Sequence, residues 1–225
     1  MKNERGHILI RRLRETDTDE VRRFCRNVQS RAAKEQLWIQ ICCYFRHPFL
    51  YSVITGTISF FYFAMQLNVV SSLSTAICLI ALTEGIRFQI FWSKIRGVFG
   101  EGQDLQNLFK YYSDSRRIFL VAMLNGQIVG TVAVRETPEK NVAKLFRMFV
   151  HRDYRRMGLA SRLISASHEE CKRNGYTSVI IRTHTTNVKA IKCYEKAGYL
   201  PTEVYNFARL YPHTFNAVSY VKENS

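Results

Sequence analysis

One short turn in the sequence has the composition of a phosphate-binding loop. It lies between a predicted strand at 143–150 and a predicted helix at about 159–173. The first four backbone N–H groups of a helix have no partner within the helix, and the helix dipole adds partial positive charge there. A glycine lets the backbone approach a ligand closely, and arginines add charge. The turn consists of Arg155, Arg156, Met157, Gly158, Leu159 and Ala160.

A second pattern, N-x-x-A-x-x-x-Y-x-x-x-G-Y, begins at Asn187 and ends at Tyr199. Asn187 can cap the helix predicted at 187–198 and can also offer its amide to a ligand. Tyr194 lies four residues after Ala190, so both side chains face the same way. Two interpretations stay open: the helix faces a ligand, or it is an ordinary capped amphipathic helix with Tyr194 in the core.

The elements around these motifs predict a mixed sheet with helices on its faces. Asn125-Gly126 between two apolar runs is typical of a β-hairpin turn. Strands outnumber helices but alternate with them in the second half of the chain. The predicted strands lie at about 7–13, 117–124, 127–137, 143–150, 178–185, 200–207 and 214–221.

Together the two motifs resemble the GNAT superfamily of acetyl-CoA-dependent N-acetyltransferases, over roughly 143–199. The N-terminal strand and helix, an apolar run at 48–83, a D-L-x-x-x-x-x-Y-Y segment and the strand L-F-R-M-F-V extend the likeness. With these the chain is similar to the camello-type membrane-bound N-acetyltransferases, which include cysteine-conjugate and aspartate N-acetyltransferases of the endoplasmic reticulum. The resemblance implies an α+β fold with a mixed, mostly antiparallel sheet, flanked by helices and carrying an inserted helical hairpin.

The resemblance also implies that acetyl-CoA is the co-substrate. It would lie in the opening where strand 143–150 splays from strand 178–185. Its pantetheine amides would pair with the backbone around Phe149 and Val150, and its pyrophosphate would sit on the amides of residues 155–160.

The reaction that the resemblance implies is direct attack of a neutral amine on the thioester. Asn187 would contact the pantetheine arm, and the Tyr194 hydroxyl would protonate the departing thiolate. Catalysis would come mainly from positioning and from a backbone N–H that stabilises the oxyanion.

The group that deprotonates the acceptor amine stays open. Many GNAT enzymes carry a glutamate on the strand before the phosphate loop, whereas this strand offers Lys144 and Arg147 and no carboxylate. Glu136 and His184 are the remaining candidates, and ordered water is a further route. Arg147 and Arg182 can each hold a carboxylate of the acceptor through two hydrogen bonds, with a surface salt bridge as the alternative.

Residues 48–83 contain no Asp, Glu, Lys or Arg, in a chain whose formal net charge is +15. A transmembrane helix needs about 20 apolar residues. The run therefore predicts two short spans, at about 48–66 and 70–90, or a re-entrant hairpin. A hairpin buried in protein is the alternative. Basic residues flank the run on both sides, which predicts that both ends lie in the cytosol.

We therefore expect three segments and a lipid bilayer as a partner. Residues 1–46 supply the first strand and helix, 47–96 the membrane hairpin, and 97–225 the rest of the acetyltransferase domain. The expected location is the endoplasmic reticulum membrane, with the catalytic domain cytosolic. Signal-peptide cleavage is not expected, because the apolar run starts far from the N-terminus and lacks the short h-region format.

Cysteine spacing and charge distribution narrow the function classes. No CxxC and no spacing typical of a metal site is present, so we expect free thiols and no metal. Acylation of Cys42 or Cys43, beside the apolar run, stays open. Nucleic-acid binding is not expected, because no basic stripe interleaved with aromatics lies outside the juxtamembrane zone. The six cysteines are Cys25, Cys42, Cys43, Cys78, Cys171 and Cys193.

The sequence thus predicts a membrane-anchored N-acetyltransferase that acetylates a primary amine of a small amino acid or cysteine conjugate. Acetylation of a protein or peptide lysine is the alternative acceptor class. A CoA-binding membrane scaffold without turnover is an alternative of another class, and a basic adaptor for membrane surfaces or nucleic acid is a third. The acceptor and the oligomeric state stay open.

Overall fold

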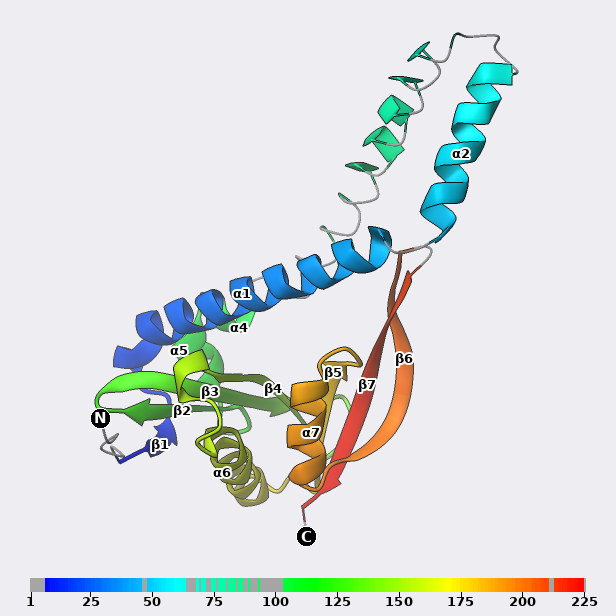
Figure 1. Cartoon of the computed structure of the whole chain (residues 1–225). Helices are drawn as coiled ribbons and strands as arrows, with labels where there is room; N and C mark the ends of the chain where they lie inside the picture. Colours follow the sequence, from blue (N-terminus) through cyan, green and yellow to red (C-terminus); the bar gives the residue numbers. More distant parts are fainter. Residues whose placement is uncertain are drawn as a thin grey trace. The chain divides into compact units, whose positions relative to one another are not determined.

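The computed structural model describes residues 7–45, 48–63, 103–210 and 213–224, with short stretches between 68 and 93 (Figure 1). The chain divides into two compact units. The first comprises Met1–Gln29, Glu101–Phe207 and Asn216–Ser225, and the second comprises Ser30–Gly100 and Ala208–Phe215. The predicted boundaries after residues 46 and 96 stay predictions.

The first unit is built on a seven-stranded sheet in the order β1-β2-β3-β4-β5-β7-β6. Only the pairing of β4 with β5 is parallel among the strand pairs whose register the structure describes. The predicted mixed, mostly antiparallel sheet is confirmed. Its strands are β1 (Leu9–Arg12), β2 (Ile118–Leu124), β3 (Gln127–Glu136), β4 (Val142–Val150), β5 (Ser178–His184), β6 (Leu200–Leu210) and β7 (His213–Glu223).

The turn between β2 and β3 is formed by Asn125 and Gly126. Their φ angles are +50° and +79°. Positive φ at both central positions is the geometry of a type I′ hairpin turn, which glycine and asparagine tolerate best. The predicted hairpin is confirmed, and it pairs the buried strands β2 and β3 in antiparallel register.

Helices cover both faces of this sheet. The helix α6 (Leu159–Arg173) has the bounds that its sequence pattern predicts, and α7 (Val188–Lys196) begins directly after its cap at Asn187. The D-L-x-x-x-x-x-Y-Y segment forms two short helices, α4 (Gln103–Gln106) and α5 (Leu108–Tyr112), on either side of Asn107.

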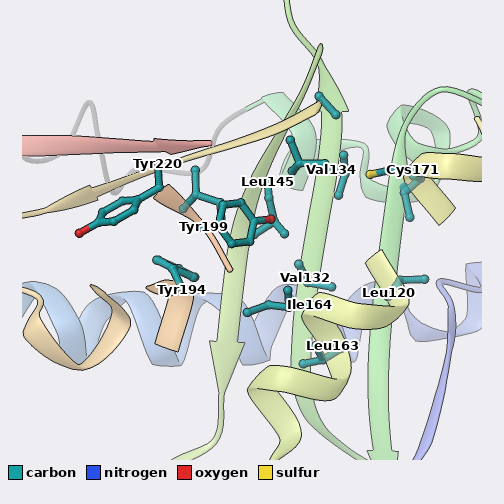
Figure 2. Packing of buried hydrophobic residues seen from close by; sticks show 14 of the residues in the cluster. Leu120, Val132, Val134, Leu145, Leu163, Ile164, Cys171, Tyr194, Tyr199 and Tyr220 are labelled. Carbon is teal, nitrogen blue, oxygen red and sulfur yellow. The ribbon is translucent and has the colours of Figure 1, made fainter. Parts of the chain in front are cut away.

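Strand alternation sends side chains into two separate cores. The first core lies on the α6 face and joins Leu120, Val132 and Leu145 to Leu163 of α6 and Tyr194 of α7 (Figure 2). The second lies on the opposite face, where α1 (Thr18–Phe45), α4 and α5 pack. It contains Val21, Cys25, Leu105, Leu108, Tyr112, Phe119, Val121, Ile128 and Ala133.

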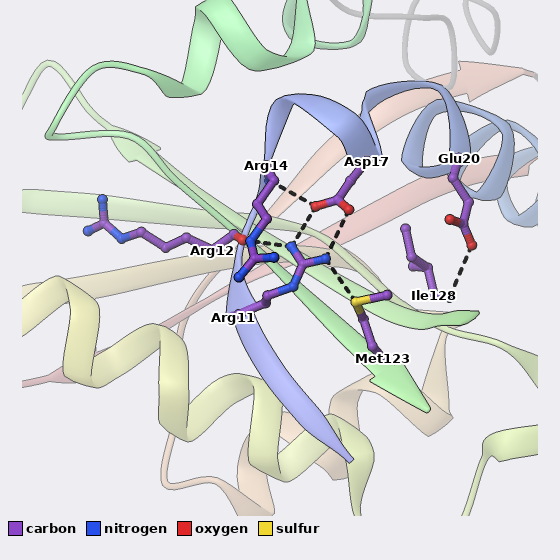
Figure 3. A network of polar contacts seen from close by, with 7 residues as sticks. All are labelled: Arg11, Arg12, Arg14, Asp17, Glu20, Met123 and Ile128. Atoms are coloured by element: carbon purple, nitrogen blue, oxygen red, sulfur yellow. Dashed lines mark hydrogen bonds and ion pairs between the residues drawn. The ribbon is translucent and has the colours of Figure 1, made fainter. Parts of the chain in front are cut away.

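An arginine on the edge strand fixes the entry to α1 (Figure 3). Arg11 holds both carboxylate oxygens of Asp17, at 2.5 and 2.9 Å, and its guanidinium also reaches the Met123 sulfur at 2.9 Å. Asp17 in turn accepts a hydrogen bond from the Arg14 backbone N–H at 2.8 Å. The contact with Arg11 is the main reason why the pKa of Asp17 lies below its ordinary value.

The second unit contains α2 (Pro48–Phe63), whose sequence PFLYSVITGTISFFYF is strongly apolar. No helix in the described part of the chain is both long enough and apolar enough to cross a bilayer. The predicted spans at 48–66 and 70–90 lie partly outside the described residues, as do the side chains of Cys42 and Cys43.

Candidate active site

The parallel strands β4 and β5 are paired over only part of their length. Their register runs from Val142 opposite Ser178 to Leu145 opposite Ile181. β4 continues to Val150 along β3, and β5 continues to His184 along β7. Beyond Leu145 and Ile181 the two strands therefore no longer pair with each other. We call the opening between their ends the fork.

A bulge in β4 lies at the fork. β3 advances two residues from Thr131 to Ala133 while β4 retreats three, from Phe149 to Phe146. The extra residue is Arg147, whose φ is +52°, and its carbonyl accepts a hydrogen bond from the Thr131 hydroxyl at 3.0 Å. Bulges re-aim the side chains and backbone that follow them.

Beyond the bulge the backbone of β4 offers a free edge. The His151 N–H donates to the Val129 carbonyl at 2.9 Å, so His151 faces β3. Strand alternation turns the N–H of Val150 toward the fork. The Val150 carbonyl accepts from Arg155 Nε at 3.3 Å. Among the two backbone positions predicted to meet pantetheine, Val150 therefore faces the fork, while Phe149 is paired with Thr131.

The predicted phosphate turn lies between β4 and α6. Gly158 is the N-cap of α6 with φ +74°, and Arg156 also has a positive φ, +64°. A Cβ at Gly158 would meet no atom within 4 Å, so the space in front of the turn is open. Residues 155–158 are exposed, whereas Leu159 is buried and Ala160 half-buried. The helix start therefore presents its N–H groups beside two arginines, as an anion site requires.

The second motif begins directly after β5, where the Asn187 N–H donates to the carbonyl of His184 at the end of that strand at 2.9 Å. The Asn187 side-chain oxygen accepts from the Ala190 N–H at 3.4 Å, so it caps α7 and leaves its NH₂ group for other partners. Tyr194 is 8% exposed, with its ring 6.1 Å from that of Tyr199 (Figure 2). Burial raises the pKa of the Tyr194 hydroxyl, which is therefore a protonated donor. Among the described residues this hydroxyl has no hydrogen-bond partner.

The profile of the acetyltransferase (GNAT) family matches residues 88–199. The chain carries a GNAT acetyltransferase domain. The match contains the fork, the phosphate turn and the helix that bears Tyr194, so the family predicted from the motifs is confirmed.

Curated relatives share part of this GNAT domain. N-acetylaspartate synthetase of Xenopus tropicalis is 36% identical over 97 residues, which are 43% of this chain and 36% of that protein. N-acetyltransferase family 8 member 2 of Rattus norvegicus is 32% identical over 122 residues, 52% of this chain and 54% of that protein. The chain thus matches only about a third to a half of the length of these relatives.

A solved structure shares the fold. A GNAT-family acetyltransferase from Staphylococcus aureus Mu50 superposes with a TM-score of 0.53 at 16% identity, covering 97% of this chain and 100% of that one. At this identity the likeness is one of fold alone. It agrees with the predicted GNAT-type α+β architecture.

The two predicted base candidates of the GNAT domain lie in different places. Glu136 pairs with Ala143, at the end of the sheet opposite Val150. Its carboxylate accepts from Arg117 at 2.6 and 2.9 Å, and this contact lowers the pKa of Glu136. The structure therefore does not bring Glu136 to the fork. His184 ends β5 beside the fork, and burial lowers the pKa of its imidazole.

The two predicted acceptor-binding arginines also differ. Arg147 is nearly buried and donates to both carboxylate oxygens of Asp104, at 3.0 and 3.1 Å. Asp104 accepts a third hydrogen bond from the Tyr112 hydroxyl at 3.2 Å. Arg182 is exposed, and its guanidinium lies 5.6 Å from the centre of the Tyr205 ring. Of the two arginines, only Arg182 is without a carboxylate partner among the described residues.

Asp104 is a site residue that the sequence analysis missed. Its spacing of eight from Tyr112 places the two on one side of a helical segment, which was the available signal. Nothing in the sequence links that segment to the bulge in β4. No cluster of three or more potential metal ligands lies within the described residues, and Cys25, Cys78, Cys171 and Cys193 carry free thiols.

Proposed function

We propose that this chain is an acetyl-CoA-dependent N-acetyltransferase that acetylates the primary amine of a small amino acid or cysteine conjugate. The observation that carries the proposal is the fork, which has an open anion-binding turn at its mouth and a protonated tyrosine beside it. This arrangement suits a long ligand with phosphate at one end and a thioester at the other.

The roles of the residues follow from their positions. The N–H groups at the start of α6, with Arg155 and Arg156, bind the pyrophosphate. Val150 offers its backbone N–H to the pantetheine arm, and Asn187 offers its NH₂ group. Acetyl-CoA supplies the activated acetyl group. The hydroxyl of Tyr194 donates its proton to the thiolate as the C–S bond breaks.

The proposed acceptor class is supported by Arg182, which has no carboxylate partner among the described residues. Arg182 can bind a carboxylate through two parallel hydrogen bonds. The relative whose name specifies a product is N-acetylaspartate synthetase, a name that matches an amino-acid acceptor. A protein or peptide lysine is the alternative acceptor.

A panel of amines tests the activity. The purified protein is incubated with acetyl-CoA and with aspartate, 3-fluoroaspartate, S-benzylcysteine, their carboxamides or a lysine peptide, and thiol release is followed together with product mass. We expect release with the carboxylate-bearing small amines. Acetyl-CoA binding without release would instead support a CoA-binding scaffold, and release with the peptide alone would support lysine acetylation.

We also propose that residues 48–83 attach the protein to the endoplasmic reticulum membrane, with the acetyltransferase unit in the cytosol. The uncharged sequence supports this, as do apolar side chains of α2 such as Phe60 and Phe63, which are 57% and 77% exposed. The pairing of β1 with β2 in one sheet supports a topology in which the segments before and after the run share a compartment.

The topology is tested by protease protection of tags fused at residues 1 and 225 in microsomes. Both tags should be digested without detergent. A protected tag at either end contradicts the proposed topology.

A further inference from the structure

Lys144 lies at the point where the two parallel strands part. On β4 it stands opposite Arg135 of β3 and beside Ile180 of β5. The next pair, Leu145 with Ile181, is the last one before the fork. The flexible four-carbon stem of this lysine can therefore carry its amine to the place where the acetyl group is transferred.

Lys144 lies on the face of the sheet opposite the core that contains Tyr194. Its neighbours Ala143 and Leu145 point into the core that contains Tyr194. Alternation along the strand turns Lys144 to the other face. The Tyr194 face is filled by α6, α7 and their core. On the Lys144 face the second core lies over β2 and β3, and Phe146 and Phe149 of β4 are only partly buried against it. An amine can therefore reach the fork from the face of Lys144.

The surroundings of Lys144 favour its neutral form. Arg135 on β3 and Arg182 on β5 share its face, and Lys144 itself is half-buried. Burial and these two cations lower the pKa of Lys144. The carboxylate that β7 contributes to this face, Glu223, is exposed and pairs with Ser178, away from the fork. Within the described residues no carboxylate forms an ion pair with Lys144.

We propose that Lys144 is the general base of the acetyl transfer, a role that rests on the function proposed above. Its neutral Nζ accepts a proton from the ammonium of the bound acceptor. The freed lone pair attacks the thioester carbonyl, the N–C bond forms and the C–S bond breaks. The thiolate takes the proton of Tyr194, the second proton of the acceptor nitrogen returns to the Tyr194 oxygen through water, and the proton on Lys144 passes to bulk water, so that both residues are restored.

This assignment accounts for the missing glutamate. The strand before the phosphate turn has no carboxylate. Glu136 stands opposite Ala143, whose side chain points into the core that contains Tyr194, and its carboxylate is held in an ion pair with Arg117. A lysine can serve instead because its pKa shifts readily toward the working pH when it is buried beside like charges.

The test compares Lys144→Arg with Lys144→Gln in the full chain. Arginine keeps the positive charge but does not release its proton at any working pH. Lys140, an exposed lysine in the loop before β4, supplies the control Lys140→Arg. kcat/KM is measured against pH for the acetylated amine of the panel, with aspartate and 3-fluoroaspartate as the matched pair. Acetyl-CoA affinity is measured by calorimetry.

Both Lys144 variants should lose about 10²-fold in kcat/KM for the strongly basic amine. Acetyl-CoA affinity and the control should be unchanged. The wild-type profile should level off above the pKa of Lys144, whereas both variants should keep rising toward the pKa of the free amine. The loss should be much smaller for the fluorinated amine, because fluorine weakens the base and more of it is already neutral.

A Lys144→Arg enzyme with the wild-type rate and profile would overturn the role of Lys144 and leave the proposed function standing. An equal loss for both amines would also overturn it, because the residue would then act through structure or charge. Absence of transfer by the wild type to every amine would overturn the proposed function, and the role of Lys144 with it.

Discussion

Arg147 and Asp104 form a two-point ion pair that locks the β4 bulge to the helical segment across from it. Both side chains are at most one-tenth exposed, and the bonds measure 3.0 and 3.1 Å. An acceptor carboxylate would have to displace Asp104 to reach Arg147. The first role of this ion pair is therefore to stabilise the shape of the fork.

Replacing Asp104 with Asn should lower stability strongly. The change leaves the Arg147 guanidinium buried without a counter-charge, which costs about 3 kcal/mol or more. Glu136→Gln is the matched control, because its pair with Arg117 is about one-third exposed, at 28% and 36%, and should cost at most about 1 kcal/mol. Urea unfolding measures both. Equal losses in the free energy of unfolding would show that the buried Arg147–Asp104 ion pair stabilises the protein no more than the exposed Arg117–Glu136 pair.

Gly158→Asp should abolish acetyl-CoA binding, and Gly158→Asn should reduce it far less. The two side chains have nearly the same shape and both tolerate the left-handed backbone at this position, so the comparison isolates the negative charge placed beside the pyrophosphate. Because the space around a Cβ is open, both variants should fold. The acetyl-CoA affinity of both variants is measured by calorimetric titration. Equal affinities would show that the pyrophosphate does not bind at this turn.

Tyr194→Phe should lower kcat by about 10²-fold, the effect of losing one general acid. The ring and its packing remain, so acetyl-CoA affinity should change little. Tyr176→Phe is the control, because it also removes a hydroxyl from a buried tyrosine, one that donates to the Arg116 carbonyl at 2.8 Å. Steady-state kinetics separates them, and a Tyr194→Phe enzyme with full activity would make Tyr194 a core residue.

Arg182→Met should raise KM for a carboxylate-bearing acceptor by about 10- to 100-fold, the effect of losing a charge-assisted hydrogen bond. The carboxamide of the same acceptor should be affected much less. Because Arg182 is exposed, folding should survive the change. The ratio of the two KM changes is the measurement, and a ratio near one would return Arg182 to its contact with Tyr205.

Acid should destabilise the start of α1 through Asp17. The pKa of Asp17 is lower in the folded protein than its ordinary value, so its contribution is present above the ordinary pKa and is lost as pH falls through the folded pKa. Asp17→Asn should therefore reduce stability at neutral pH and flatten its dependence on acid. Urea unfolding at a series of pH values shows this, and parallel curves for the two proteins would contradict it.

Local signals in the sequence predicted much of the fold. Asn125-Gly126 specifies its turn through backbone conformation alone, and the apolar period of 159–173 specifies α6 between a glycine at each end. The phosphate turn is also local, because a strand, a glycine and a helix start suffice to build it. These features depend on residues that are neighbours in the chain.

The contacts that decide roles inside the site are not local. Arg147 meets Asp104 only because a bulge with positive φ turns it toward that segment, and no pattern of strand residues announces such a bulge. Glu136 forms its ion pair with Arg117, which lies directly before the adjacent strand β2. The pKa of Lys144 is lowered partly by Arg135 and Arg182, which the strand register places on the same face of the sheet. The sequence pattern did not predict how β3, β4 and β5 pair residue by residue.

The pairing of β1 with β2 bears on the order in which the chain can assemble. Leu9 stands opposite Met123, so β1 has no partner until the whole uncharged run and the segment after it have been synthesised. Closing so long a loop costs entropy before any contact repays it. β1 is thus paired late in synthesis, after the chain has made residues 48–83, the segment proposed above to attach to the membrane.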